Sequence, residues 1–142
     1  FSQVFAALFE YRVAQMTDMV DHGHPLIRPV WFHHPNEEAL LDQSLAFALG
    51  RSIFVYPVLD RARRHIKVCL PPGTYRHLFT GARYEGLTDH RVHAPLGLPA
   101  VFIDEESEWS ERLVTRIRAI ERPERIPPLG PLQWSADGRL PD

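Results

Sequence analysis

Proline and glycine divide residues 25–103 into short apolar segments, and this spacing limits the possible folds more than any other feature of the sequence. Residues 45–49 and 66–70 alternate apolar side chains with others, as half-buried strands do. Residues 53–59 are continuously apolar and rich in strand-forming side chains. Turn sequences such as Pro71-Pro72-Gly73 separate these segments. Short strands with such turns between them indicate an antiparallel β-sandwich.

The predicted fold is therefore mainly β, with the sandwich spanning residues 44–103. Residues 53–59 would form a central strand. Because Pro57 has no backbone N–H, it must lie where the neighbouring strand needs no hydrogen bond from it. The pattern predicts that the following residues are among those buried: Ile53, Val55, Val58, Ile66, Val68, Val101 and Phe102.

A helix is predicted over residues 1–22, before the strands. One stripe of apolar side chains recurs at helical spacing, and Val4, Leu8 and Tyr11 widen it. The members of that stripe are Phe5, Phe9, Val13, Met16 and Val20. A helix that is apolar over so much of its circumference needs neighbours on two sides. Because the sequence opens inside this helix, we expect the chain to be cut from a longer protein that supplies one neighbour.

A second amphipathic helix is predicted after the strands, capped by Asp104 or Ser107 and ended by Pro123. Its apolar side chains are Trp109, Leu113, Ile117 and Ile120. Residues 123–142 are proline-rich without periodicity, which predicts a loose tail. The predicted organisation is residues 1–24 for the first helix, 25–122 for the sandwich with its terminal helix, and 123–142 for the tail.

The composition excludes several classes of partner. The chain has 16 basic and 18 acidic residues, which argues against nucleic-acid binding. No apolar run reaches the roughly 20 residues of a membrane span. The single cysteine, Cys69, excludes a disulfide framework and is consistent with a reducing compartment, so a cytoplasmic location is expected.

No complete active site is visible in the sequence. Glycosidase chemistry requires two facing carboxyl groups, and no pattern enforces such a pair. The acids considered are Asp18, Asp21, Glu37, Glu38, Asp42, Asp60, Asp89, Asp104, Glu105 and Glu106. Residues 104–106 are more simply explained as a helix N-terminus. Cys69 has no evident base, and no nucleophile motif or phosphate-binding glycine loop is present. We therefore assign no catalytic, cofactor-binding or metal-binding residue.

Two further kinds of side chain are candidate binding groups: the histidines for a metal ion and several aromatic residues for a sugar. His22, His24, His33 and His34 lack metal-ligand spacing, and no bound metal is expected. Strand positions predict that His77, His90 and His93 face solvent. Five aromatic residues could form a sugar-stacking platform, although core packing is the favoured explanation. They are Trp31, Phe32, Tyr75, Tyr84 and Trp109.

Ordered sequence blocks add a resemblance to a known family. The blocks are LIRPVWF (26–32), DQ (42–43) with FALG (47–50), IFVYPV (53–58), VCLPPGTY (68–75), FTG (79–81), RYEG (83–86), AP (94–95) and LPAVFI (98–103). Their order over about residues 1–104 resembles the C-terminal part of glycoside hydrolase family 31.

The resemblance implies that residues 1–22 are the last helix of a (β/α)₈ barrel and that the strands form the sandwich packed against it. It implies a retaining α-glycosidase whose nucleophile and acid/base aspartates lie on barrel loops before this chain. No residue here matches either motif, so the isolated chain is expected to be inactive. Carbohydrate would bind through the missing barrel, and the exposed helix 1–22 could drive association.

Two departures from the family pattern concern Tyr56 and the end of the sandwich. Tyr56 stands where the family commonly has Ala and needs a larger pocket. Residues 103–109 lead into a helix, which is similar to the sulfoquinovosidase-like branch of the family. The alternative is a free-standing carbohydrate-binding β-sandwich, but such a module should not begin with a helix that is apolar on two sides.

Overall fold

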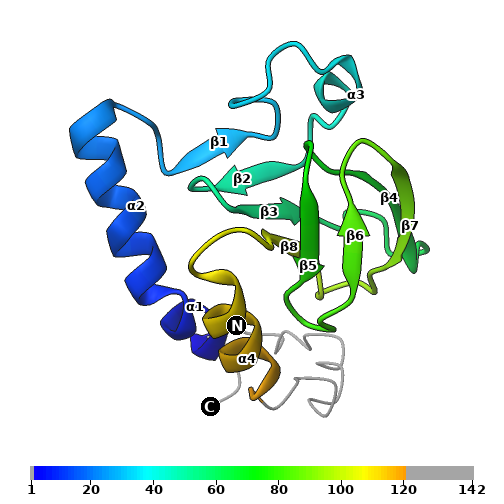
Figure 1. Cartoon of the computed structure of the whole chain (residues 1–142). Coiled ribbons are helices and arrows are strands. Elements are labelled where there is room, and N and C mark those ends of the chain that lie inside the picture. The colour runs from blue at the N-terminus through cyan, green and yellow to red at the C-terminus, as the bar shows by residue number, and fades with distance from the viewer. Residues whose placement is uncertain (1, 121–142) are drawn as a thin grey trace, which may run out of the picture.

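The computed structural model describes residues 2–120, and its elements follow the predicted order of helix, strands and helix (Figure 1). The helices are α1 (Ser2–Ala7), α2 (Phe9–His22), α3 (Glu38–Leu41) and α4 (Ser110–Arg118). The strands are β1 (Ile27–Pro29), β2 (Phe47–Leu49), β3 (Ile53–Tyr56), β4 (His65–Cys69), β5 (Thr74–His77), β6 (Arg83–Glu85), β7 (Asp89–His93) and β8 (Ala100–Asp104). The tail predicted at 123–142 lies outside the described residues.

The described strands form two antiparallel sheets, which confirms the predicted fold class. One sheet has six strands in the order β1-β2-β3-β8-β5-β6, and the other contains β4 and β7. β3 and β8 are the central pair, with Phe54 opposite Phe102 in the register. The second layer is thus only two strands wide.

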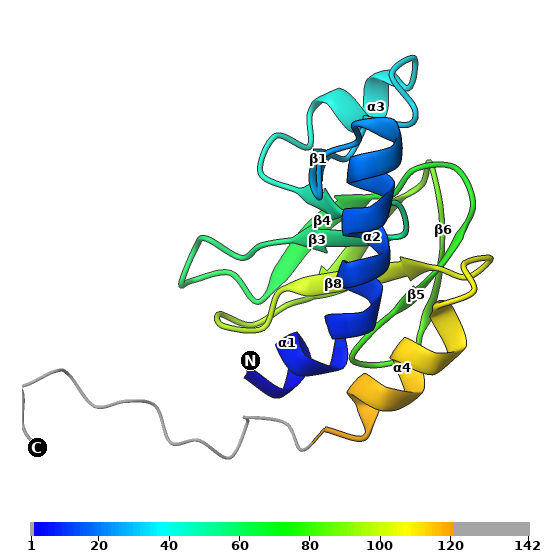
Figure 2. The same cartoon turned by 90° about the vertical axis from the view of Figure 1, so that its left-hand side faces the viewer.

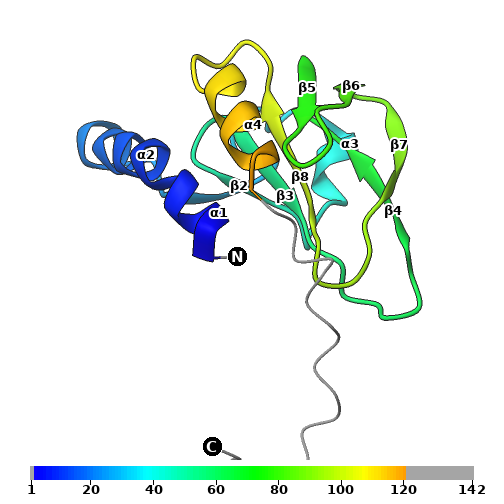
Figure 3. The same cartoon turned by 90° about the horizontal axis from the view of Figure 1, so that it is seen from below.

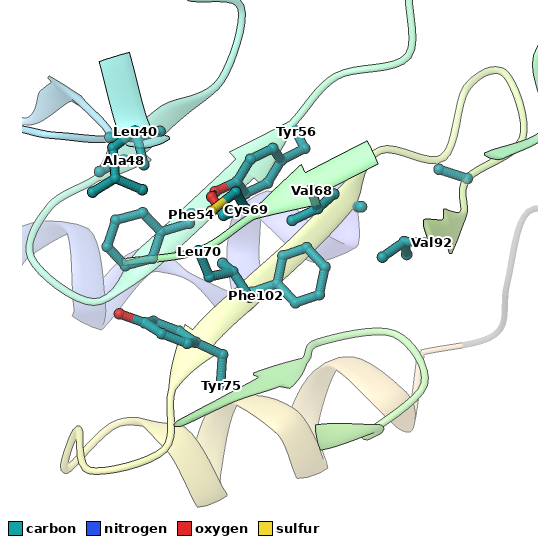
Figure 4. Packing of buried hydrophobic residues seen from close by; sticks show 13 residues of the cluster. Leu40, Ala48, Phe54, Tyr56, Val68, Cys69, Leu70, Tyr75, Val92 and Phe102 are labelled. Atoms are coloured by element: carbon teal, nitrogen blue, oxygen red, sulfur yellow. The ribbon is translucent and has the colours of Figure 1, made fainter. Parts of the chain in front are cut away.

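The central strands β3 and β8 are covered on both faces, which explains their continuous apolar character. Phe54 and Phe102 point into a core shared with β4 and β7 (Figure 4). Ile53 and Ile103, one residue away on the same strands, point into a second core shared with the helices. Adjacent residues therefore serve opposite faces, as the strand period of two requires.

The predicted core residues lie in or against these two cores. Four are buried: Ile53, Val68, Val101 and Phe102. Three are half-buried and pack against a core: Val55, Val58 and Ile66. The central strand is shorter than the predicted 53–59 and ends at Tyr56, so Pro57 follows it and removes no ladder donor.

The N-terminal helix is divided in two, contrary to the single helix predicted over residues 1–22. The break lies at Leu8, between α1 and α2. Arginine side chains bind carbonyls near the break: Arg12 donates to the Phe5 oxygen at 3.0 Å, and Arg116 to the Ala7 oxygen at 3.4 Å. The bend keeps Ala7 and Tyr11 in the second core. At the other end, Gly23 adopts the expected left-handed cap with φ 73°.

The predicted cap of the C-terminal helix was wrong. α4 begins after Trp109, whose backbone is already helical, and no side chain caps it. Ser107 and Asp104 instead accept hydrogen bonds from residues two positions ahead, in the turns that precede the helix. Both side chains therefore stabilise the loop rather than the helix end.

α1, α2 and α4 lie on the side of the large sheet opposite the small sheet, whereas Leu40 of α3 packs in the core shared with β4 and β7. Figure 2 shows α2 running across the face of the large sheet, and Figure 3 places α1, α2 and α4 away from β4 and β7. None of the described helices combines the length and apolar character that crossing a membrane requires.

Candidate functional site

α2 is attached to the sandwich by a polar seam, which we define as Tyr11, Gln15 and Asp18. These residues are spaced at i, i+4 and i+7, so they share one helix face. The Tyr11 hydroxyl donates to the Leu49 carbonyl at 2.7 Å and accepts from the Ser52 amide at 3.0 Å. Its burial raises the pKa of the Tyr11 phenol to about 12. The helix is therefore held to the β2–β3 turn by directional bonds.

Gln15 continues the seam at the same turn. Its side-chain oxygen accepts from the Arg51 amide at 2.9 Å. The Gln15 side chain also lies against Gly50, where a Cβ atom would collide with it. Gly50 has φ 63°, a conformation that favours glycine in any case. A side chain at residue 50 would therefore strain the turn and require the Gln15 side chain to move.

The third seam residue, Asp18, belongs to a charged cluster around the fully buried side chain of Arg28. Arg28 donates to Asp18 Oδ2 at 2.7 Å through Nη2 and to the Pro25 carbonyl at 2.6 Å through Nε. Its Nη1 lies 2.7 Å from His33 Nε2. This Arg28 cluster ties the end of α2 to β1 and to the loop that follows β1.

Two more histidines approach the same carboxylate. His22 Nδ1 lies 2.9 Å from one Asp18 oxygen, and His24 Nδ1 lies 3.2 Å from the other. The His24 ring also contacts the His33 ring, with centroids 5.7 Å apart. His22 and His24 are therefore joined in space to His33 through Asp18 and Arg28.

The electrostatics of the Arg28 cluster oppose a role in acid catalysis. The hydrogen bond from Arg28 is the main cause that lowers the pKa of Asp18 to about 2. Burial, followed by the charge of Arg28, lowers the pKa of His33. A neutral His33 accepts the Arg28 proton at Nε2 and carries its own proton on Nδ1. A glycosidase acid needs a raised carboxyl pKa, so the cluster is suited to holding structure.

This arrangement predicts acid-sensitive stability. Because the pKa of Asp18 is lower in the folded chain than its ordinary 3.8, its contribution is complete above about pH 4 and is lost as the pH falls through 2. The expected loss is about 2 kcal/mol. Urea unfolding between pH 5 and 2 measures it, with Asp18→Asn as the control that lacks this titration. An equal pH dependence in both proteins would contradict the prediction.

Three of the other carboxylates considered in the sequence form surface ion pairs. Asp60 pairs with Arg63 at 3.3 Å, Asp89 with Lys67 at 2.9 Å, and Glu105 with Arg83 at 2.6 Å.

One pocket of about 400 Å³ gathers carboxylates from α2 and from residues 104–108. They are Asp18, Asp104, Glu106 and Glu108, and Arg51 lies beside them. Asp18 binds Arg28, and Asp104 accepts from the Glu106 amide at 3.0 Å. Both carboxylates therefore have hydrogen-bond donors from the chain itself. No pattern in the sequence indicates that Asp18 lines the same pocket as the acids of residues 104–108.

The prediction that His77 faces solvent was wrong. Its side chain is buried among Phe79, Tyr84 and Phe102, and its Nδ1 accepts from the Phe79 amide at 3.2 Å. The register gives the reason: His77 pairs with Phe102, so it shares the inward face of that residue. His93 is exposed as predicted, and His90 is half-buried. Within residues 2–120, no group of three histidine, cysteine or carboxylate side chains is arranged so that it could hold a metal ion, while the absence of a bound metal stays a prediction.

The five aromatics do not form one platform. Tyr75 lies in the core against Phe54, with ring centroids 5.5 Å apart. Tyr84 packs against Phe102, and Trp109 packs edge-on against Tyr11. Trp31, from a different part of the molecule, is exposed. Core packing accordingly accounts for three of the five, and a sugar-stacking surface has no support in their placement.

α1 and α2 expose a continuous apolar surface on the side away from the polar seam. Its large side chains are 42–79% exposed. We call it the apolar helix face, and it consists of Phe5, Phe9, Val13, Met16, Met19 and Val20. The predicted stripe is therefore the part of the helix that has no neighbour among the described residues. Such a surface is typical of a contact with another protein segment.

Sequence reasoning overlooked two residues on which this region depends, Tyr11 and Arg28. The sequence pattern places Tyr11 in a broad apolar stripe, but its hydroxyl forms two hydrogen bonds. Arg28 stands inside the apolar run 26–32, and an arginine there is a signal for a buried ion pair because it seldom enters a core alone.

Comparison with known proteins identifies the family. The sequence profile of the Glycosyl hydrolase family 31 C-terminal domain matches residues 23–107. The chain is 31% identical over 107 residues to the sulfoquinovosidase of Escherichia coli K12, an alignment that covers 75% of this chain and 16% of that protein. It is 30% identical over 118 residues to the sulfoquinovosidase of Agrobacterium fabrum, with 82% and 18% covered.

Solved structures agree with the sequence matches. A family 31 sulfoquinovosidase from E. rectale superposes with a TM-score of 0.74 at 29% identity, covering 81% of this chain and 17% of that one. A family 31 α-xylosidase from a soil metagenome superposes with a TM-score of 0.71 at 33% identity, covering 76% and 16%. The chain thus spans less than a fifth of these relatives. From its sandwich and these matches, the chain belongs to glycosyl hydrolase family 31, and residues 23–107 are its C-terminal domain.

Proposed function

We propose that this chain is the supporting C-terminal part of a retaining α-glycosidase and that the catalytic carboxylates belong to a barrel outside it. The apolar helix face is the observation that carries the proposal. Large apolar side chains that are 42–79% exposed over two consecutive helices are unfavourable in water. A barrel that packs against α1 and α2 would cover them.

The polar seam is the means by which the sandwich would support the barrel, because it attaches α2 to the sandwich. Tyr11, Gln15 and Asp18 hold α2 to the sandwich by hydrogen bonds, while the apolar face is left for the barrel. The sandwich would thereby fix the last barrel helix, and with it the loops at the active site. Catalytic geometry is sensitive to displacements of about 1 Å, so this indirect role affects the rate.

The proposed reaction is hydrolysis of an α-glycoside by double displacement. It needs a nucleophile and an acid on opposite sides of one anomeric carbon. The names of the relatives from E. coli and A. fabrum favour an α-sulfoquinovoside as the substrate, with an α-glucoside as the second choice.

The test compares the 142-residue chain with a longer protein encoded by the same gene, using aryl α-sulfoquinovoside and aryl α-glucoside substrates. We expect no turnover by the chain and turnover by the longer protein. The readout is release of the aryl alcohol. Turnover by the chain that disappears in Asp60→Asn or Asp104→Asn would overturn the proposal, because it would place the active site in the sandwich.

A further inference from the structure

The contact between Arg28 and His33 can exist in only one protonation state. The Arg28 cluster lies where α2 passes into β1 (Figure 1), and Arg28 Nη1 is 2.7 Å from His33 Nε2. A guanidinium keeps its charge in proteins and can only donate, so His33 Nε2 must accept. A protonated imidazole carries hydrogen on both ring nitrogens and cannot accept. Protonation of His33 therefore breaks this hydrogen bond and places two cations in contact.

The two partners of this bond differ in their access to water. The Arg28 side chain is fully buried, whereas His33 as a whole residue is exposed and only its contact with Arg28 is partly buried. His33 can thus take up a proton from solvent, while Arg28 can neither lose its charge nor reach water. His33 is accordingly the member of the pair that responds to pH.

The groups around His33 give a protonated ring no negative partner. Besides Arg28 of β1, His24 of the segment between α2 and β1 faces it, with ring centroids 5.7 Å apart. Arg51 of the β2–β3 turn and His34 of the same loop also lower the pKa of His33. Within residues 2–120, no carboxylate forms an ion pair or a hydrogen bond with His33. A protonated His33 is therefore repelled from several sides.

The carboxylate that α2 contributes to the cluster, Asp18, is engaged by other groups. It accepts from Arg28, and His22 and His24 approach it through Nδ1. His22 and His24 can donate to a carboxylate whether or not they are protonated, so their titration does not abolish these bonds. Of the three histidines in the cluster, only His33 makes a bond that protonation removes.

We propose that His33 is a pH-sensitive latch, whose protonation uncovers Arg28 and loosens the end of α2. The protonated ring turns away from the guanidinium, and water reaches Arg28. A solvated ion pair is screened and holds its partners weakly, so the contact between Asp18 and Arg28 then ties α2 to β1 less firmly. All members of the latch lie in this chain, so the inference does not depend on the proposed glycosidase role.

The latch opens in mild acid. Burial is the main cause that lowers the pKa of His33 below its ordinary 6.5, and the charge of Arg28 adds to it. The folded chain therefore takes up this proton less readily than the unfolded chain. The stability that His33 contributes is complete above about pH 6.5 and is lost as the pH falls through the lowered pKa. This loss begins at a higher pH than the loss expected from Asp18, whose ordinary pKa is 3.8.

Hydrogen exchange of the 142-residue chain tests the latch at the backbone amides of residues 18–22. After correction for intrinsic rates, exchange at these amides should be about fivefold faster at about pH 5 than at about pH 7.5, the effect of losing one hydrogen bond. His33→Gln offers Arg28 an oxygen acceptor that does not titrate, so this variant should be equally protected at both pH values. NMR of the unsubstituted chain should show that His33 titrates below pH 6.5.

The matched control is His34→Gln, which replaces the neighbouring histidine that makes none of the hydrogen bonds to Arg28. It should lose protection in acid as the unsubstituted chain does, and so should His22→Asn/His24→Asn. Three exchange results would overturn the proposal: no acid response in the unsubstituted chain, an unchanged response in His33→Gln, or its loss in either control. If His33→Gln is already unprotected at about pH 7.5, the NMR titration decides, and a His33 midpoint at or above about 6.5 overturns the latch.

Discussion

Replacement of Phe102 by alanine should lower the free energy of unfolding by about 4 kcal/mol, the cost of emptying a large aromatic site in a packed core. Phe102 is fully buried on the central strand β8. Its ring packs edge-on against Tyr56, Tyr84 and His77, with centroids 5.1–5.8 Å apart. Because four aromatic rings share this position, the neighbours cannot collapse into the space without losing contacts with one another.

The same substitution at Phe9 is the matched control. Phe9 is 59% exposed on the apolar helix face, so Phe9→Ala removes the same atoms without creating an internal cavity. Urea unfolding should show a loss below about 1 kcal/mol for this variant. Sedimentation should also show less self-association, because the apolar face is reduced. Equal destabilisation by the two variants would show that the core assignment is wrong.

The sheet core could be predicted from the sequence because its signal is local. Each strand shows its burial in its own pattern: β4 alternates, whereas β3 and β8 are continuously apolar and lie between two layers. Turn residues with positive φ, such as Gly73 and Gly81, mark where strands end. This information is contained in segments of about ten residues, so no knowledge of distant contacts is needed.

Cross-strand neighbours could not be predicted in the same way. The short strand around His77 contains both polar and apolar residues, so its own sequence predicts a solvent-facing His77. The face is instead set by its register partner Phe102, which is 25 positions away in the sequence. Register decides which face a residue occupies. Register between distant strands depends on the whole sheet, and a single strand does not reveal it.

The orientation of the N-terminal helix was ambiguous for a similar reason. Its sequence has two apolar faces and no indication of which one the chain itself covers. The structure covers the face that includes Tyr11 and leaves Phe5 and Val20 exposed. The covered face packs in the second core and adds hydrogen bonds between the Tyr11 hydroxyl and the backbone of Leu49 and Ser52, and such bonds are invisible in a hydrophobic pattern.

The polar seam and the proposed function are connected through the Arg28 cluster. A helix that offers its apolar face to a barrel cannot use that face to hold the sandwich. Its attachment depends on the packing of Ala7 and Tyr11 in the second core and on a few directional bonds. Of these bonds, those from buried Arg28 are the most demanding because the guanidinium has no access to water. Loss of one partner there should be costly.

Asp18→Asn tests this dependence and should destabilise the chain by about 3 kcal/mol, since it removes the negative partner of a buried cation while preserving side-chain size. Arg28 would keep the Pro25 carbonyl and His33, which are neutral acceptors. The matched control is Asp60→Asn, because Asp60 and Arg63 form an ion pair with both side chains more than half exposed. Such surface pairs contribute at most about 1 kcal/mol. Urea unfolding at pH 7 should therefore separate the two variants by about 2 kcal/mol or more. If Asp18→Asn unfolds like Asp60→Asn, the Arg28 cluster does not hold α2 to the sandwich, and the structural basis of the proposed support role fails with it.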